Sequence, residues 1–269
     1  MSIEKSRVTV AESVDFVRAC IKKRQLAGMI RARSSAPTIT SSPTKELDAL
    51  VLGDSLIGYG GNISLGNMRV IEDIITMSKI EAKYQVPDHK DAKGRYIEFI
   101  NCMEALGCFV PDSGYSKYRS SSLSVTMDNV MVDIIQAAVE AAKAAIPGAT
   151  VLSAVTNSTL TALKKDPEAI NLLNLESKDA EGVRLSTIPC EQLPNGLIVV
   201  ALAAVDHRGG SDNGGVLFVD WKTSALDVFQ GKACLTFNPA RYAEVKDLVE
   251  EYLAGHRKTL LSKRFSRRP

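Results

Sequence analysis

The feature that most constrains the fold is a change in sequence pattern near residue 176. Before that point, apolar residues recur at spacings of three and four, the period of an α-helix. After it, short apolar runs are separated by Gly-, Asn- and Asp-containing turns, a pattern typical of strands. Such segregation favours the α+β class. We therefore expect a helical N-terminal portion packed with a small antiparallel β-sheet and a C-terminal helix.

The same pattern divides the chain into four segments. Residues 1–43 combine a first helix with a linker, because residues 34–44 read SSAPTITSSPT and are rich in Ser, Thr and Pro. In that helix, Thr9 and Glu12 have the spacing of a capping box. Residues 44–176 are the helical portion, 177–256 the antiparallel sheet with the terminal helix, and 257–269 a basic tail.

Individual elements follow from periodicity. Helices are expected over residues 65–84, 91–106 and 240–253. The continuous apolar run LIVVALAAV at 197–205 predicts a central strand that is buried on both faces. Further strands are expected at 216–221, 225–229 and 233–237, with Gln230 and Gly231 forming the turn between the last two.

Composition excludes several classes. The net charge of +2 over 269 residues is too small for a protein that binds nucleic acid through its overall charge, so sequence-specific nucleic-acid binding is not expected. Five cysteines without a CxxC pair suggest neither a disulfide framework nor a zinc site, and no metal or cofactor is predicted. No secretion signal or run of 18 apolar residues is present, which predicts a cytoplasmic protein, released by lysis or by dedicated secretion.

Residues 128–163 are the most apolar part of the helical portion. On the first arm, Asp133, Gln136, Glu140 and Lys143 define one thin polar stripe, and Pro147-Gly148 separates this arm from a hydroxyl-rich second arm. Because this helical hairpin has so little polar surface, we expect it to be buried in the protein's own core, in a partner or in a membrane. The predicted membrane or partner contacts are Val130, Ile134, Ala138, Pro147, Gly148, Leu152 and Val155.

The end of the chain is strongly basic. From residue 257 to residue 269 there are six Lys or Arg residues and no acid. Because like charges repel and bury little apolar surface, we expect a tail that is dispensable for folding and binds anionic surfaces electrostatically. Its expected contacts are Arg257, Lys258, Lys263, Arg264, Arg267 and Arg268.

A short block offers an enzymatic alternative. Residues 50–57, LVLGDSLI, resemble the opening block of the GDSL-type serine hydrolases. The resemblance implies an esterase whose nucleophile is Ser55, at the end of a first strand. The Gly-x-Asn-Asp block of that family and its late Asp-x-x-His pair are missing. None of His89, His207 and His256 follows an acid by three positions, so no catalytic residue is predicted from the triad requirement.

The function favoured by these observations is that of a non-enzymatic effector or toxin-like virulence protein. It would be membrane-active through the apolar hairpin, by membrane contact or by self-assembly into a homo-oligomer, with a membrane surface or a protein as its partner. Two alternatives remain open at the level of sequence. One is the serine esterase using Ser55, and the other is a structural or binding-partner protein.

Overall fold

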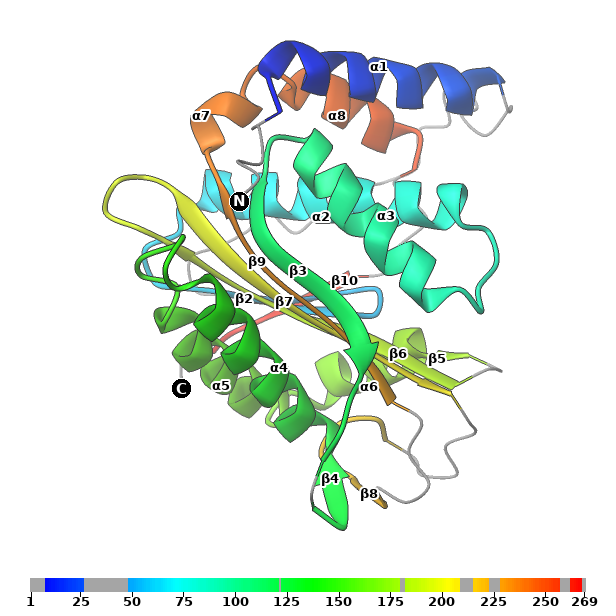
Figure 1. The fold of residues 1–269 in the computed structure, drawn as a ribbon, viewed down its shortest axis with the longest axis vertical. Helices are drawn as coiled ribbons and strands as arrows, with labels where there is room; N and C mark the ends of the chain where they lie inside the picture. The colour runs from blue at the N-terminus through cyan, green and yellow to red at the C-terminus, as the bar shows by residue number, and fades with distance from the viewer. Residues whose placement is uncertain are drawn as a thin grey trace, which may run out of the picture.

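The computed structural model describes residues 8–26, 48–120, 122–179, 182–208, 215–222, 228–256 and 262–267. In these residues one large β-sheet lies between two layers of helices (Figure 1). The expected α+β class is confirmed. Two hydrophobic cores result, one on each face of the sheet.

The sheet contains strands from distant parts of the chain. Its main path runs β10 (Ser262–Phe265), β1 (Ala49–Leu52), β2 (Ser55–Tyr59), β6 (Gly182–Gln192), β7 (Ile198–Arg208), β9 (Val228–Phe237) and β3 (Phe109–Lys117), with β5 (Lys178–Asp179) beside β6. Only the β2–β6 pair is parallel among the described pairs. Strands β4 (Ser124–Thr126) and β8 (Asp220–Lys222) form a separate small sheet. The sheet is therefore larger than expected, since β1, β2 and β3 come from the segment assigned to helices.

Strand β7 is the central strand that the apolar run predicts. It pairs with β6 on one side and with β9 on the other. Val200 and Leu202 are buried in the first core, whereas Val199 and Ala201 are buried in the second. This alternation follows from the two-residue period of a strand, and it explains why every position of the run is apolar.

The C-terminal strands differ from expectation. The turn expected at Gln230-Gly231 is wrong, because both residues lie inside the continuous strand β9. A Cβ atom on Gly231 would come within 2.5 Å of the Tyr96 ring, so the glycine permits close packing and does not mark a turn. The strand expected at 216–221 is reduced to β8, and Phe218 has a φ of 60°. Residues 225–227 lie outside the described residues.

The first helical layer consists of α1 (Val10–Leu26), α2 (Leu65–Gln85), α3 (Ala92–Ala105), α7 (Pro239–Tyr242) and α8 (Lys246–Ala254). The capping box of α1 is confirmed, with Thr9 N donating to Glu12 Oε2 at 2.7 Å and Glu12 N to Thr9 Oγ1 at 3.3 Å. The expected single helix 240–253 is interrupted between α7 and α8. Helix α2 packs against both α3 and α8.

The second layer, on the opposite face, consists of α4 (Met127–Ala142), α5 (Val151–Leu163) and α6 (Pro167–Ser177) (Figure 1). Helix α4 packs on β7 and β9, and α5 packs on β6 and β2. A Cβ atom on Gly58 of β2 would come within 2.1 Å of Thr159 Oγ1, so this glycine lets α5 lie close to the sheet.

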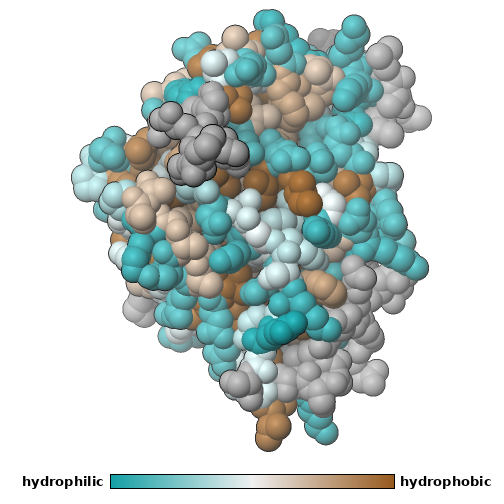
Figure 2. All heavy atoms as spheres, viewed as in Figure 1, coloured by the Kyte–Doolittle hydropathy of each residue, from teal (hydrophilic) through white to brown (hydrophobic). Residues whose placement is uncertain are grey.

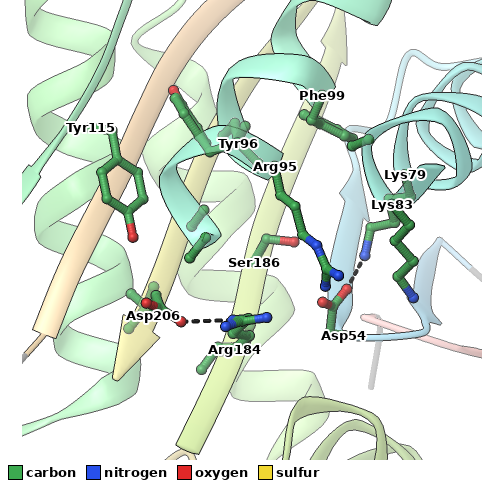
Figure 3. Close-up of a pocket in the computed structure, with 16 residues that line it drawn as sticks. Asp54, Lys79, Lys83, Arg95, Tyr96, Phe99, Tyr115, Arg184, Ser186 and Asp206 are labelled. Atoms are coloured by element: carbon green, nitrogen blue, oxygen red, sulfur yellow. Dashed lines mark hydrogen bonds and ion pairs between the residues drawn. The ribbon is translucent and has the colours of Figure 1, made fainter. Parts of the chain in front are cut away.

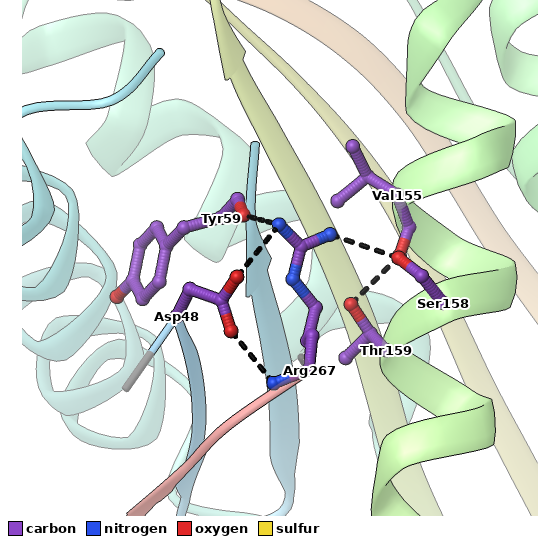
Figure 4. A network of polar contacts seen from close by, with 6 residues as sticks. All are labelled: Asp48, Tyr59, Val155, Ser158, Thr159 and Arg267. Atoms are coloured by element: carbon purple, nitrogen blue, oxygen red, sulfur yellow. Dashed lines mark hydrogen bonds and ion pairs between the residues drawn. The ribbon is translucent and has the colours of Figure 1, made fainter. Parts of the chain in front are cut away.

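Residues 262–265 of the basic tail form a strand of the sheet, whereas the sequence predicts a segment that is dispensable for folding. Strand β10 pairs antiparallel with β1, and Phe265 is only 3% exposed. Arg267 donates from its backbone N to Asp48 Oδ1 at 2.7 Å and from its guanidinium to Ser158 Oγ at 2.9 Å (Figure 4). Arg264 forms an ion pair with Glu72. Each of these acids lies about 200 residues earlier in the chain, so the tail closes one edge of the fold.

Candidate functional site

The residues predicted to form an apolar hairpin lie on the inner side of the second layer. Val130, Ile134 and Ala138 on α4 and Leu152 on α5 belong to the core beneath that layer, and Val155 is also buried. No apolar hairpin stands apart from the described part of the fold. Pro147 and Gly148 are exposed in the connection between the helices, where Gly148 has a φ of 92°. The segment predicted to be an apolar hairpin is therefore an amphipathic helix pair that covers one face of the sheet.

The polar stripe of α4 faces solvent, as its spacing predicts. Asp133, Gln136, Glu140 and Lys143 are all exposed. The opposite side of the helix is apolar and buried. Within the described residues, one side-chain hydrogen bond joins α4 to a distant part of the fold, from Tyr118 Oη, just after β3, to Asp133 Oδ2 at 3.1 Å. Apolar packing therefore carries almost all of its attachment.

Three of the tail residues predicted to bind an anionic surface form ion pairs within the fold. The side chains of Arg264 and Arg267 are 6% and 10% exposed and are paired with Glu72 and Asp48. Lys263 forms ion pairs with Glu168 and with Asp166. Contact of these three residues with an anionic surface would require breaking internal ion pairs. Arg257, Lys258 and Arg268 lie outside the described residues.

The block that resembles a hydrolase motif forms a β-hairpin. Leu52 pairs with Ser55, so Gly53 and Asp54 are the two central residues of the turn. Gly53 has a φ of 56°, as the first position of a tight hairpin turn requires. Ser55 is fully buried, and its hydroxyl is hydrogen-bonded to that of Ser186. A nucleophile needs an accessible oxygen, and this one is enclosed.

The histidines do not complete a catalytic site around Ser55. On β7, His207 shares the face of Val205 and packs edge-on against Trp221 in the second core, whereas Ser55 and Ser186 project to the other face. His256 is buried against the ring of Tyr252, 4.5 Å away between centroids. His89 is exposed in the connection between α2 and α3. The described geometry therefore does not assemble the triad of a serine esterase.

A pocket that the sequence did not reveal lies between the first helical layer and the sheet (Figure 3). It is a cavity of about 140 Å³. Helix α2 supplies Lys79 and Lys83, and α3 supplies Arg95, Tyr96 and Phe99. The turn between β1 and β2 supplies Asp54, and strands β6 and β7 supply Arg184, Ser186, Leu202, Ala204 and Asp206. These residues are up to 152 positions apart in the chain, from Asp54 to Asp206, so no local motif marks the pocket.

Two ion pairs organise the charged end of the pocket. Lys79 is paired with Asp54, and Arg184 Nε donates to Asp206 Oδ1 at 2.7 Å. The second pair joins residues directly opposite each other on β6 and β7. Burial lowers the pKa of Lys79, and the carboxylate of Asp54 opposes that shift.

The described residues contain neither a cluster of metal-binding side chains nor a helix that could cross a bilayer. Among them, no three His, Cys, Asp or Glu side chains are placed to hold a metal ion. No described helix combines the length and the hydropathy needed to cross a bilayer. All five cysteines are free and buried.

No family model and no curated protein matches the chain. A solved structure named delta-endotoxin aligns with 77% of this chain and 88% of its own, at 13% identity and a TM-score of 0.38. The structure of the Evf virulence factor aligns with 87% of this chain and 90% of its own, at 12% identity and a TM-score of 0.30. The assignment of a function therefore rests on the geometry of this chain.

Proposed function

We propose that this protein is a non-enzymatic effector that acts at a membrane surface by moving the layer of α4 and α5 away from the sheet. The observation that carries this proposal is the two-sided character of α4. One side is wholly apolar, and the other carries the exposed stripe of Asp133, Gln136, Glu140 and Lys143. A helix of this kind lies in the interface of a bilayer, with its apolar side in the acyl region.

The surface beneath α4 supports the same proposal. The strands offer it small and branched aliphatic residues, among them Val199, Ala201, Ala203 and Val205 of β7. Separation of the layer would therefore expose two apolar surfaces at once, one on the helices and one on the sheet. In water this exposure is costly, at about 25 cal/mol per Å². A lipid surface would remove much of that cost by covering the α4 side.

The folded surface keeps these apolar residues hidden. In Figure 2, hydrophilic residues predominate on the visible face, and hydrophobic ones appear as separate small areas. The exposed large hydrophobic residues of the described chain are scattered, namely Leu65, Ile97, Leu123, Val151 and Leu175. Membrane contact by this route consequently depends on a conformational change and not on a preformed apolar patch.

Charge favours a zwitterionic surface over an anionic one. Exposed Asp133 and Glu140 outnumber Lys143 on the polar side of α4, and the exposed positions of α5 are uncharged. The tail cations Arg264 and Arg267 are held by internal acids. Binding should therefore be strongest to phosphatidylcholine vesicles, with little gain from anionic lipid and little dependence on salt.

The experiment is a disulfide lock built on a native thiol. Cys234 of β9 belongs to the core beneath α4. Ala138→Cys would join the helix to the sheet, and the other inward positions of α4 are screened in the same way for the separation of about 4 Å between Cβ atoms that a disulfide requires. Oxidised protein should fail to bind phosphatidylcholine vesicles and fail to release an entrapped dye. The same variant after reduction should do both.

Two controls accompany the lock. Wild-type protein under the same oxidising conditions should retain activity, since Cys234 then has no partner on α4. Circular dichroism should show that the locked form keeps its fold. Full leakage by the oxidised variant would refute the movement of α4. Absence of vesicle binding by the wild type at every lipid composition would refute membrane action and favour the binding-partner alternative.

A further inference from the structure

We propose that the pocket between α2, α3 and the sheet binds a small amphiphile that carries one carboxylate or phosphate group. This site lies on the opposite face from α4 and is independent of the membrane proposal. It stands on three properties of the pocket: its size, its two-part lining and its excess of cations.

The size sets the class of ligand. A water molecule needs roughly 10–15 Å³ of cavity measured in this way, so about 140 Å³ holds roughly ten water-sized groups. This is the size of a short acyl or alkyl chain with its head group. It is too small for a nucleotide or a whole phospholipid, of which only the head-group region would enter.

The lining is apolar in one part and charged in the other. Phe99, Leu202 and Ala204 form an apolar wall, while the ring of Tyr96 is fixed by a hydrogen bond from its hydroxyl to the backbone oxygen of Lys232. Tyr115 packs against Tyr96 with 5.6 Å between ring centroids. A rigid aromatic and aliphatic wall suits a short hydrocarbon chain, because it loses little entropy when the chain binds.

The charged part carries more cations than acids. Lys79, Lys83, Arg95 and Arg184 line the pocket with only two carboxylates, Asp54 and Asp206. Glu176 adds one negative charge close enough to act on Lys79. Positive charge therefore remains in excess however these groups pair, and an anionic head group would balance it.

The cations are also held in place before any ligand arrives. Arg95 donates from Nε to the backbone oxygen of Val86 at 2.9 Å and from a terminal nitrogen to that of Pro87 at 3.0 Å. Figure 3 shows the charged ends of Arg95 and Lys79 directed toward Asp54. The two backbone carbonyl groups fix the position of the guanidinium, and fixed donors of this kind favour carboxylate or phosphate oxygens.

The test is calorimetric titration of the full chain with hexyl phosphate and hexanoate. Inorganic phosphate and hexanol supply the head group alone and the chain alone. Both amphiphiles should bind at least about tenfold more tightly than either half, because the chain and the head group contribute separately. Equal affinity for hexyl phosphate and inorganic phosphate would contradict a two-part pocket.

Two variants locate the binding site. Ala204→Leu fills the apolar part and should abolish binding of hexyl phosphate. Lys83→Gln removes an exposed cation without disturbing the core and should weaken binding several-fold, whereas Lys165→Gln, an exposed cation just beyond α5, should not. If Ala204→Leu does not fold, the comparison of Lys83→Gln with Lys165→Gln still tests the proposed site. Unchanged affinity in both pocket variants would overturn the proposal.

A second arm separates the two sources of the anionic group. Vesicles of dioleoyl phosphatidic acid present it as a lipid head group, and hexyl phosphate presents it as a free molecule. Loss of vesicle binding in Ala204→Leu would identify a lipid head group as a ligand. Loss of hexyl phosphate binding alone would identify a free metabolite-sized amphiphile. Retention of both would refute the site.

Discussion

On one face of the sheet, α2 is joined to its neighbours by polar side chains, whereas on the other face α4 lies on the sheet through apolar side chains. Glu72 of α2 accepts from Tyr59 Oη at 2.7 Å and is paired with Arg264. Glu81 accepts from Arg24 at 2.6 Å and from Tyr252 Oη at 2.5 Å. Among the described residues, helix α4 has a single side-chain hydrogen bond to a distant part of the fold, from Tyr118.

This contrast in bonding distinguishes a layer that is fixed to the sheet from one that can separate from it. Buried hydrogen bonds and ion pairs are directional, and breaking one leaves a buried charge without a partner, at a cost of several kcal/mol. Apolar contacts are not directional, and a lipid surface can replace them. The first layer is therefore suited to hold a small pocket in shape, and α4 of the second layer is suited to leave the sheet.

The largest loss of stability is expected from a substitution in β7, because the two faces of this strand belong to the two cores. Val200→Asp places a carboxylate in the first core, where the native side chain is buried. The cost of several kcal/mol approaches the total stability of a domain, so the variant should not fold. Ala137→Asp, on the exposed side of α4, is the matched control and should melt as the wild type does. A cooperative melt of Val200→Asp would show that β7 is not central.

The closing strand of the sheet should be the next most sensitive part. Phe265→Ala removes a buried ring from β10 and is expected to lower the free energy of unfolding by about 3–5 kcal/mol. Urea denaturation measures the change, with exposed Ser262→Ala as the control on the same strand. A loss below about 0.5 kcal/mol would restore the sequence-based expectation of a dispensable tail.

Two fully buried methionines allow a direct comparison of the layers. Met77 lies in the first core and Met131 of α4 in the second. Each change to Ala should cost about 2–5 kcal/mol in urea denaturation. Only Met131→Ala should also increase binding to phosphatidylcholine vesicles, because it loosens the layer that we propose leaves the sheet. An equal increase from Met77→Ala would mean that general destabilisation, and not release of α4, promotes binding.

Alkaline pH should weaken the fold by a smaller amount. Burial raises the pKa of Cys20 and Cys108 to about 12 and that of Cys234 to about 11. Burial also raises the pKa of Cys102 and Cys190. The unfolded chain loses these protons around pH 9 while the folded chain keeps them, so stability is complete below about pH 8 and declines as the pH rises through 9.

The expected loss between pH 8 and pH 9 is roughly 1–2 kcal/mol for five thiols, measured as a shift of the urea midpoint. Cys108→Ala should show a shallower decline, since it has one thiol fewer. A midpoint that does not change over this interval would indicate that the thiols are solvated in the folded protein.

The parts of the fold that could be predicted from the sequence are those with a local signal. The run at 197–205 specifies β7 because both of its faces are buried, and Thr9 with Glu12 specifies the start of α1. Strand β3 was missed because most of its residues are only half-buried at a sheet edge, so no continuous apolar run or clean alternation marks it.

The charged parts could not be predicted because their partners are distant. Arg267 has the appearance of a tail cation until the fold brings Asp48 beside it. The pocket has the same origin, since Asp54 and Lys79 meet Arg184 and Asp206 only when β2, β6 and β7 are side by side under α2. Sequence pattern reports which residues are buried, and it is silent on which charges the topology pairs.

The native cysteines provide the most direct measurement of the difference between the layers. Cys234 lies in the core beneath α4, whereas Cys20, Cys102, Cys108 and Cys190 lie in the first core. Folded wild-type protein is treated with N-ethylmaleimide, and the alkylated sites are followed by peptide mass spectrometry. The account predicts that Cys234 reacts first while the other four remain protected. Earlier or simultaneous alkylation of the four thiols in the first core would contradict it.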